Sequence, residues 1–249
     1  MVDTHCHLDA CDPPAAELLE RARAAGVERL ATVGTDDAGI ERALSTAREH
    51  DEVVAIVGRH PHEATDFDGA ALERIEAAAG DPEARAIGET GLDFYRDHAP
   101  REDQRRAFEA QIELADRLGL PLVIHTRAAE EATFSLLRER AAHLSVVLHC
   151  FSAPGHLEEC LDHGWLCSFA GNVTYPNAED LRAAARDVPD HLLLVETDSP
   201  YLAPQPFRGK ANEPANLVAT AETVAAVREV SYAELERTVE RNAARVFRW

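Results

Sequence analysis

Short apolar runs alternate with longer amphipathic stretches along the whole chain. The short runs are rich in β-branched residues, which favour strands, and the longer stretches repeat their apolar positions at helical spacing. The pattern is weakest for the fourth and seventh of the eight predicted strands. These strands are expected at residues 2–5, 29–33, 53–57, 85–88, 121–124, 145–148, 165–169 and 192–195.

Proline and glycine mark the ends of several predicted helices. Pro14 precedes the first helix and Gly26 ends it, while Gly119 ends a later one. Ser231 and Glu234 form a capping box that sets the start of the last helix. The predicted helices cover residues 15–25, 37–49, 70–79, 101–118, 129–142, 154–162, 178–186, 214–230 and 231–247.

The order of these elements predicts the fold class. Strands that alternate with helices pair in parallel. Eight such units in 249 residues favour a closed (β/α)8 barrel, because barrels of this kind use about 250 residues as one unit. A doubly wound open sheet is the alternative. No linker or low-complexity segment divides the chain, so we expect a single domain over residues 1–249.

The charge of the chain is unusual. It contains 25 Lys and Arg against 45 Asp and Glu, a net charge of −20, and its only lysine is Lys210. This composition is similar to that of halophile proteins, whose acidic surfaces stay hydrated in strong salt. A GC-rich genome would explain arginine in place of lysine but not the carboxylate excess. We therefore expect a halophilic protein that loses structure in low salt.

Compartment and cysteine usage point to the cytoplasm. No stretch approaches the roughly 20 apolar residues of a membrane span, and no signal peptide is visible at the N-terminus. The five cysteines form no C-x-x-C pair, so we expect reduced thiols. Cys6 and Cys150 adjoin histidines, and neighbours on a strand face opposite ways, so neither is expected to bind metal.

Side chains able to bind a metal follow six of the eight predicted strands. The carboxyl ends of the strands carry the active site in (β/α)8 barrels, so these side chains should meet there. His5 and His7 are two residues apart and point to one face. Imidazoles together with carboxylates suit borderline and hard divalent cations. The residues at these strand ends are His5, His7, His60, His62, Glu89, His125, His149, Glu196 and Asp198.

Six motifs together resemble the motif series of the TatD-related metal-dependent deoxyribonucleases, which belong to the amidohydrolase-like metal barrels. Each motif alone is modest, but their order and spacing make the set specific. The similarity extends from the first strand to the loop RGKANEP at 208–214. The motifs are DTHCHLD at 3–9, GRHPH at 58–62, GETGLDFY at 88–95, HTR at 125–127, HCF at 149–151 and ETDSPYL at 196–202.

The resemblance implies a site for two divalent cations with Glu89 as the bridge. A carboxylate between two cations about 3.5–4 Å apart offsets their repulsion. A phosphate substrate favours Mg²⁺, whereas four histidines also suit Mn²⁺ or Zn²⁺. One ion would be bound by His5, His7, Glu89 and Asp198, and the other by Glu89, His125 and His149.

The resemblance also implies hydrolysis of DNA phosphodiester bonds by a metal-activated water, as a 3′–5′ exonuclease. Asp198 is the expected catalytic residue, because it could orient that water and accept its proton. Glu196 lies two residues earlier on the same face and is expected to orient a ligand or water. The expected contacts to substrate phosphate are His62, Arg127 and Arg208, with Lys210 beside the last.

The acidic surface limits the kinds of nucleic acid that we expect the protein to bind. It opposes broad contact with a polyanion, so a DNA end or short single strand is a better substrate than a long duplex. No run of aromatic and basic residues indicates a stacking platform, and no protein partner is evident. Two alternatives stay open: hydrolysis of an amide, lactone or ester at the same metals, and a metal-dependent binding protein without catalysis.

Overall fold

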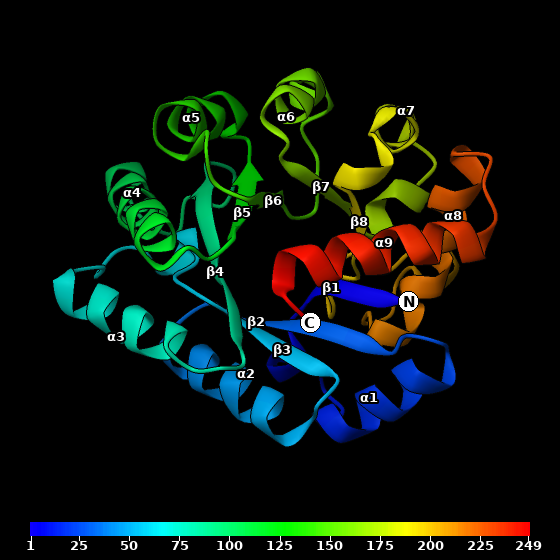
Figure 1. The fold of residues 1–249 in the computed structure, drawn as a ribbon, viewed down its shortest axis with the longest axis horizontal. Coiled ribbons are helices and arrows are strands. Elements are labelled where there is room, and N and C mark those ends of the chain that lie inside the picture. The colour runs from blue at the N-terminus through cyan, green and yellow to red at the C-terminus, as the bar shows by residue number, and fades with distance from the viewer.

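The computed structural model describes all 249 residues and contains one sheet of eight parallel strands. The strands follow one another around the sheet in chain order, and helices surround them (Figure 1). The predicted (β/α)8 barrel is therefore confirmed, and the doubly wound alternative is wrong. The strands are β1 (Val2–Cys6), β2 (Arg29–Gly34), β3 (Val53–Val57), β4 (Ala84–Asp93), β5 (Leu122–Arg127), β6 (Val146–Leu148), β7 (Leu166–Phe169) and β8 (Leu193–Val195).

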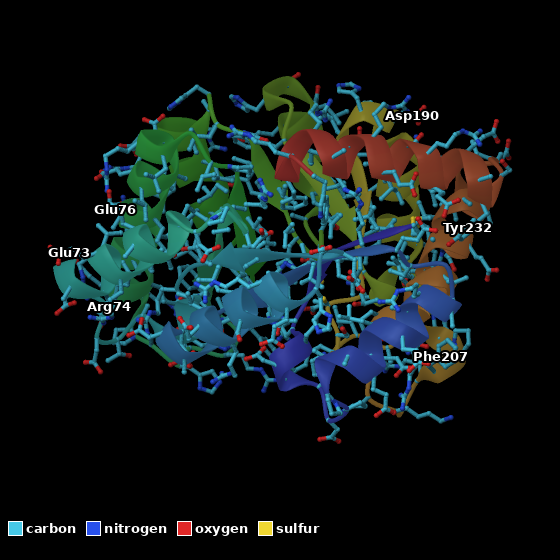
Figure 2. All side chains as sticks on the ribbon, turned by 60° about the horizontal axis from the view of Figure 1, so that its bottom comes forward. Glu73, Arg74, Glu76, Asp190, Phe207 and Tyr232 are labelled. Carbon is cyan, nitrogen blue, oxygen red and sulfur yellow. The ribbon has the colours of Figure 1, made fainter.

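The helices bury one face and expose the other. In α3, Ala71 and Ile75 are buried four residues apart, while Glu73, Arg74 and Glu76 point away from the sheet (Figure 2). None of the helices has the length and apolar character needed to cross a lipid bilayer. The helices are α1 (Ala15–Ala24), α2 (Asp37–Glu49), α3 (Gly69–Ala79), α4 (Arg101–Leu118), α5 (Glu130–Leu136), α6 (Leu157–His163), α7 (Glu179–Asp187), α8 (Leu217–Val227) and α9 (Tyr232–Phe247).

Two predicted helices begin with a 3-10 turn. These turns cover Pro154–His156 before α6 and Pro214–Asn216 before α8. Proline lacks an N–H and has a fixed φ, so it is compatible with a tight first turn. The helix expected at 129–142 divides into α5 and a π-helical turn at Leu137–Ala141. The alternation of strands and helices is unchanged.

Strand β4 is longer than predicted because its glycines bring it close to β5. The pattern indicated a strand over 85–88, but pairing with β5 continues as far as Asp93 opposite Arg127. Gly91 has a φ of 136°, and a Cβ there would overlap the carbonyl oxygen of His125. Gly91, which lies beyond the end of the predicted strand, is thus a point of close backbone approach. This extension places Glu89 inside the barrel.

The segment after β8 connects that strand to β1 and closes the barrel. Buried Asp3 accepts hydrogen bonds from the Thr197 backbone N–H at 2.9 Å and from its hydroxyl at 2.6 Å. The backbone N–H of Asp198 donates to the His5 carbonyl at 2.9 Å. Burial, together with the nearby charge of Glu196, raises the pKa of Asp3 to about 7, although these hydrogen bonds lower it. Closure therefore sets Asp198 beside His5.

Helix α9 covers the amino ends of the strands, opposite the predicted site (Figure 1). The buried side-chain amide of Asn242 donates to the carbonyls of Asp190 and Leu193, at 2.6 and 2.8 Å, where β8 begins. The ammonium group of Met1 donates to Glu236 at 2.7 Å. These bonds satisfy polar groups that the barrel end would otherwise bury unpaired.

Asn242→Ala is expected to lower the free energy of unfolding by about 1–3 kcal/mol, because the buried Leu193 carbonyl and the partly buried Asp190 carbonyl lose their donor. Urea denaturation measures the change. Arg237→Ala, at an exposed position of the same helix, is the control and should leave the midpoint unaltered. Equal midpoints for Asn242→Ala and the parent protein would contradict this role of α9.

Candidate metal centre

The carboxyl ends of the strands surround a polar pocket of about 840 Å³. This is the end of the barrel at which enzymes of this fold carry their active sites. Polar and charged side chains form most of its lining, and they come from segments far apart in the sequence. They include His7, His60, His62, Glu89, Asp93, His125, Arg127, His149 and Asp198.

One group of side chains faces the Oε2 atom of Glu89. The Nε2 atoms of His5 and His7 lie 3.3 and 3.6 Å from this oxygen and 3.3 Å from each other. The Oδ1 atom of Asp198 is 3.4 Å from His7 Nε2 and 4.0 Å from His5 Nε2. Strands β1 and β4 and the segment after β8 thus bring four potential ligands together.

A second group faces the other oxygen of Glu89. Nδ1 of His125 lies 2.8 Å and Nε2 of His149 lies 2.9 Å from Oε1. Glu89 itself is buried, with an exposed fraction of 2%. Burial alone would raise its pKa, but imidazoles around it, His149 first, hold the pKa well below its usual value. Glu89 is therefore an anion between two groups of nitrogen ligands.

The donor set fits divalent cations. Ligand atoms that share one ion at about 2.0–2.2 Å lie about 3.0–3.6 Å apart, which is the spacing among His5, His7 and Glu89. His5 Nδ1 is buried without a hydrogen-bond partner. A neutral His5 that carries its proton there turns the lone pair of Nε2 toward the carboxylate. A cation between His5 Nε2 and the Glu89 carboxylate would remove the repulsion between these two acceptors.

His60 was noted in the sequence among the metal-capable side chains at the strand ends but was given no specific role. Its Nδ1 accepts the backbone N–H of His62 at 3.1 Å, so the neutral ring carries its proton on Nε2. That Nε2 lies 3.4 Å from Glu89 Oε1. Burial lowers the pKa of His60 to about 4, although Glu89 opposes this effect. His60 thus faces Glu89 as a hydrogen-bond donor rather than as a ligand.

Two further carboxylates orient the histidines. Oε1 of Glu196 lies 3.0 Å from His149 Nδ1, which leaves Nε2 of that ring directed at Glu89. Oδ2 of Asp93 lies 3.2 Å from His125 Nε2 and 2.8 Å from His62 Nε2. Carboxylates behind ligand histidines fix ring orientation and proton position. Glu196 was expected in such a place; Asp93 was missed, although the GETGLDFY motif contains it.

Cys150 departs from the predicted orientation. It lines the pocket, so the expectation that it faces away from the histidines is wrong. The residue follows β6 with a φ of 43°, and strand alternation does not apply to that backbone. Burial raises the pKa of the Cys150 thiol well above its usual value, which makes it a poor ligand. Cys6 does face away, with its sulfur 3.4 Å from the Ala31 carbonyl oxygen.

The predicted substrate contacts divide between two places. His62 and Arg127 line the metal pocket, whereas Arg208 lines a neighbouring one. The Arg127 guanidinium lies 4.2 Å from the ring centroid of Tyr95, whose side chain is largely exposed. An aromatic and basic surface therefore exists at the pocket mouth, although no run in the sequence indicated one.

Fold and site together define a class. A parallel (β/α)8 barrel with histidines and carboxylates converging at the carboxyl ends of its strands has the architecture of a metal-dependent hydrolase. The family model described as "TatD related DNase" matches residues 2–248. The chain belongs to this TatD family, and it is a metal-dependent hydrolase of that family.

Relatives are similar over nearly their whole length. The "Uncharacterized metal-dependent hydrolase YabD" of Bacillus subtilis is 38% identical, with 100% of this chain and 99% of the relative covered. The "3'-5' ssDNA/RNA exonuclease TatD" of Erwinia tasmaniensis is 36% identical, with 93% and 92% covered. The crystal structure of YjjV, a TatD homologue from Escherichia coli, superposes with a TM-score of 0.93 at 27% identity, covering 100% and 98%.

Removal of metal by EDTA is expected to lower the Tm, and added Mn²⁺ or Zn²⁺ should restore it. A ligand at 1,000 times its Kd adds about 4 kcal/mol to the stability of the folded state. Thermal unfolding with and without metal measures the effect. In Glu89→Gln, which lacks the central charge, the metal-dependent shift should be largely lost.

Glu63→Gln is the matched control. Glu63 is an exposed carboxylate that lines the same pocket, and its variant should keep the full shift. If EDTA and metals leave the Tm of the parent protein unchanged, or if Glu89→Gln responds like the parent, the proposed centre is wrong.

Proposed function

We propose that the protein is a 3′–5′ exonuclease that hydrolyses phosphodiester bonds at the ends of single-stranded DNA, using two divalent cations. The observation that carries this proposal is the division of ligands between the two oxygens of Glu89. One carboxylate with a separate ligand group on each oxygen suits a two-metal phosphoesterase. The name of the Erwinia relative, a 3′–5′ exonuclease on single strands, supports the direction and the substrate.

The residues for the two ions follow from this division. His5, His7, Asp198 and Glu89 would bind one, and Glu89, His125 and His149 the other, with Mg²⁺ or Mn²⁺ suited to a phosphate substrate. When bound, such ions neutralise phosphate charge and make a water molecule more acidic.

We assign to Asp198 the acceptance of the proton from the attacking water. Its carboxylate lies at the inner wall of the pocket beside His7. Burial would raise its pKa, but the hydrogen bond with His7 and the charges of nearby histidines lower it below its usual value. Asp198 is thus a carboxylate at neutral pH and can accept a proton when the water attacks phosphorus.

We assign contact with the substrate phosphate to His62 and Arg127. His62 is half-buried and directs Nε2 at Asp93, 2.8 Å away. Burial lowers the pKa of His62, and an arriving phosphate favours the protonated ring. Protonated His62 can donate from Nδ1 to a phosphate oxygen while Nε2 stays bonded to Asp93. Arg127 makes no ion pair with a carboxylate and adds a second donor at the mouth.

Asp198→Asn is expected to lower kcat on single-stranded DNA by about 10²- to 10⁴-fold, the usual value of a general base. A DNA oligonucleotide labelled at its 5′ end, incubated with Mg²⁺ or Mn²⁺, should give a ladder that shortens from the 3′ end. Asp9→Asn is the matched control, because Asp9 lines the pocket but pairs with Arg42.

Three outcomes would contradict the proposal. These are equal cleavage of circular and linear single strands, full activity of Asp198→Asn, and turnover of an ester, lactone or cyclic amide in place of every oligonucleotide. An RNA strand of the same sequence, run in parallel, determines whether the sugar matters.

We further propose that the protein works in a salt-rich cytoplasm. The net charge of −20 and the single lysine support this. The Tm should rise between dilute buffer and 3 M KCl, because the Debye length falls from about 10 Å at 0.1 M to about 3 Å at 1 M. NaCl of equal ionic strength is the control and should reproduce the rise, because screening depends on ionic strength. A Tm that is independent of KCl would contradict the halophilic assignment.

A further inference from the structure

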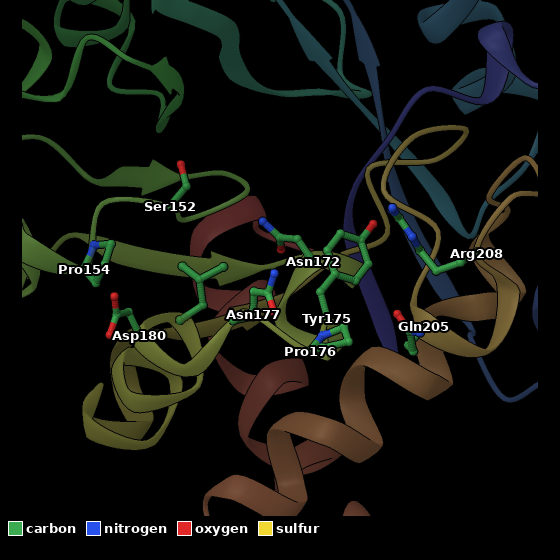
Figure 3. Close-up of a pocket in the computed structure, with 11 residues that line it drawn as sticks. Ser152, Pro154, Asn172, Tyr175, Pro176, Asn177, Asp180, Gln205 and Arg208 are labelled. Atoms are coloured by element: carbon green, nitrogen blue, oxygen red, sulfur yellow. The ribbon is translucent and has the colours of Figure 1, made fainter.

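A second pocket adjoins the metal pocket. It has a volume of about 550 Å³, within the usual range for ligand sites of about 300–1,000 Å³. It shares the side chains of Ser152 and Asn172 with the metal pocket and contains none of the metal-ligand candidates. Figure 3 shows its labelled side chains along a trough, from Asp180 and Pro154 at one end to Gln205 and Arg208 at the other, with Asn172, Asn177 and Tyr175 between them. We call it the Asn172–Arg208 pocket.

The wall of this pocket is fixed by contacts within the protein. A Cβ on Gly171 would overlap the carbonyl oxygen of Leu202, so the loops after β7 and β8 touch there. The hydroxyl of Tyr175 donates to the Ala203 carbonyl at 3.1 Å. The guanidinium of Arg182 donates to the Tyr175 carbonyl at 2.6 Å. Tyr175 is therefore held in place from both sides before any ligand binds, which reduces the entropy cost of binding.

The arginines at the two pockets are free of carboxylate partners. Arg96, Arg127 and Arg208 line them, and none forms an ion pair, although most arginines of this acidic chain do. Each lies instead over a tyrosine ring: Arg208 is 4.2 Å from the centroid of Tyr175, and the other two lie over Tyr95. Their charge is available to a nucleic-acid backbone.

The remaining lining favours a nucleobase over a bare phosphate. The side-chain amides of Asn177 and Gln205 offer donors and acceptors, and Asp180 offers only acceptors. A phosphate needs donors alone and is repelled by Asp180. A nucleobase presents donors and acceptors on its edges and an aromatic face that stacks on tyrosine or arginine.

We propose that the Asn172–Arg208 pocket is a subsite for the nucleobase of a nucleotide that flanks the bond being cleaved. The base stacks against the pair formed by Tyr175 and Arg208, and its edge meets Asn177 and Gln205. The shared wall at Asn172 places this base next to the phosphate in the metal pocket. This inference rests on the proposed exonuclease function and adds the position at which the strand is recognised.

Single-stranded DNA with one abasic site at the first or the second nucleotide from the 3′ end tests the subsite. At one of these positions the parent protein should lose about 5- to 100-fold in kcat/KM, the value of one stacked base. In Arg208→Ala and in the double variant Asn177→Ala/Gln205→Ala this loss should shrink to about twofold or less, because the partner of the base is gone. Arg29→Ala, an exposed residue at the opposite end of the barrel, is the control and should keep the full loss.

Binding of the same oligonucleotides is measured by fluorescence anisotropy with EDTA present, so that the subsite has a readout without turnover. We expect the abasic site to weaken binding to the parent protein and to have little effect on binding to the variants. If the parent protein degrades DNA but shows no abasic penalty at either position, or if the variants keep the penalty, the subsite is wrong and the exonuclease proposal stands. If no strand is degraded, the exonuclease proposal is wrong, and equal anisotropy of intact and abasic strands then overturns the subsite as well.

Discussion

The active end of the barrel depends on one buried carboxylate, Glu89, whose two oxygens face different sets of imidazoles. An anion in this position would be costly without positive or hydrogen-bonding neighbours. The histidines supply such neighbours. Their ring nitrogens converge on the carboxylate of Glu89, so a charged group is needed between them. In the proposed two-metal centre, a cation on each side of Glu89 would meet both needs, and such a centre fits the hydrolase class.

The barrel builds this centre with contacts that lie behind the ligands. The hydrogen bonds between Asp3 and Thr197 join the first strand to the segment that carries Asp198. Gly91 allows β4 to approach β5. The buried side-chain amide of Gln104 holds the end of β4, because it accepts from the backbone N–H of Asp93 and donates to the Asp93 carbonyl. Precise ligand placement therefore rests on buried hydrogen bonds and close strand contacts behind the ligands.

The sequence was most informative about features that follow from local patterns of apolar and polar residues. Alternating strands and helices predicted the barrel, and a shared place at strand ends predicted which ligand candidates would meet. Two features depended on distant contacts and could not be predicted: the length of β4 and the placing of Arg208 in a pocket of its own. The proton position of His60 depends on the local turn in which its Nδ1 accepts the His62 N–H. Cys150 was misplaced because its positive φ is not visible in a strand pattern.

The central claim concerns how many ions Glu89 binds and where. Anomalous diffraction from crystals grown with Mn²⁺ measures this directly. The account predicts two peaks about 3.5–4 Å apart, one beside each oxygen of Glu89, the first near His5 and His7 and the second near His125 and His149. A single peak at saturating Mn²⁺, or two peaks that do not share Glu89, would contradict it.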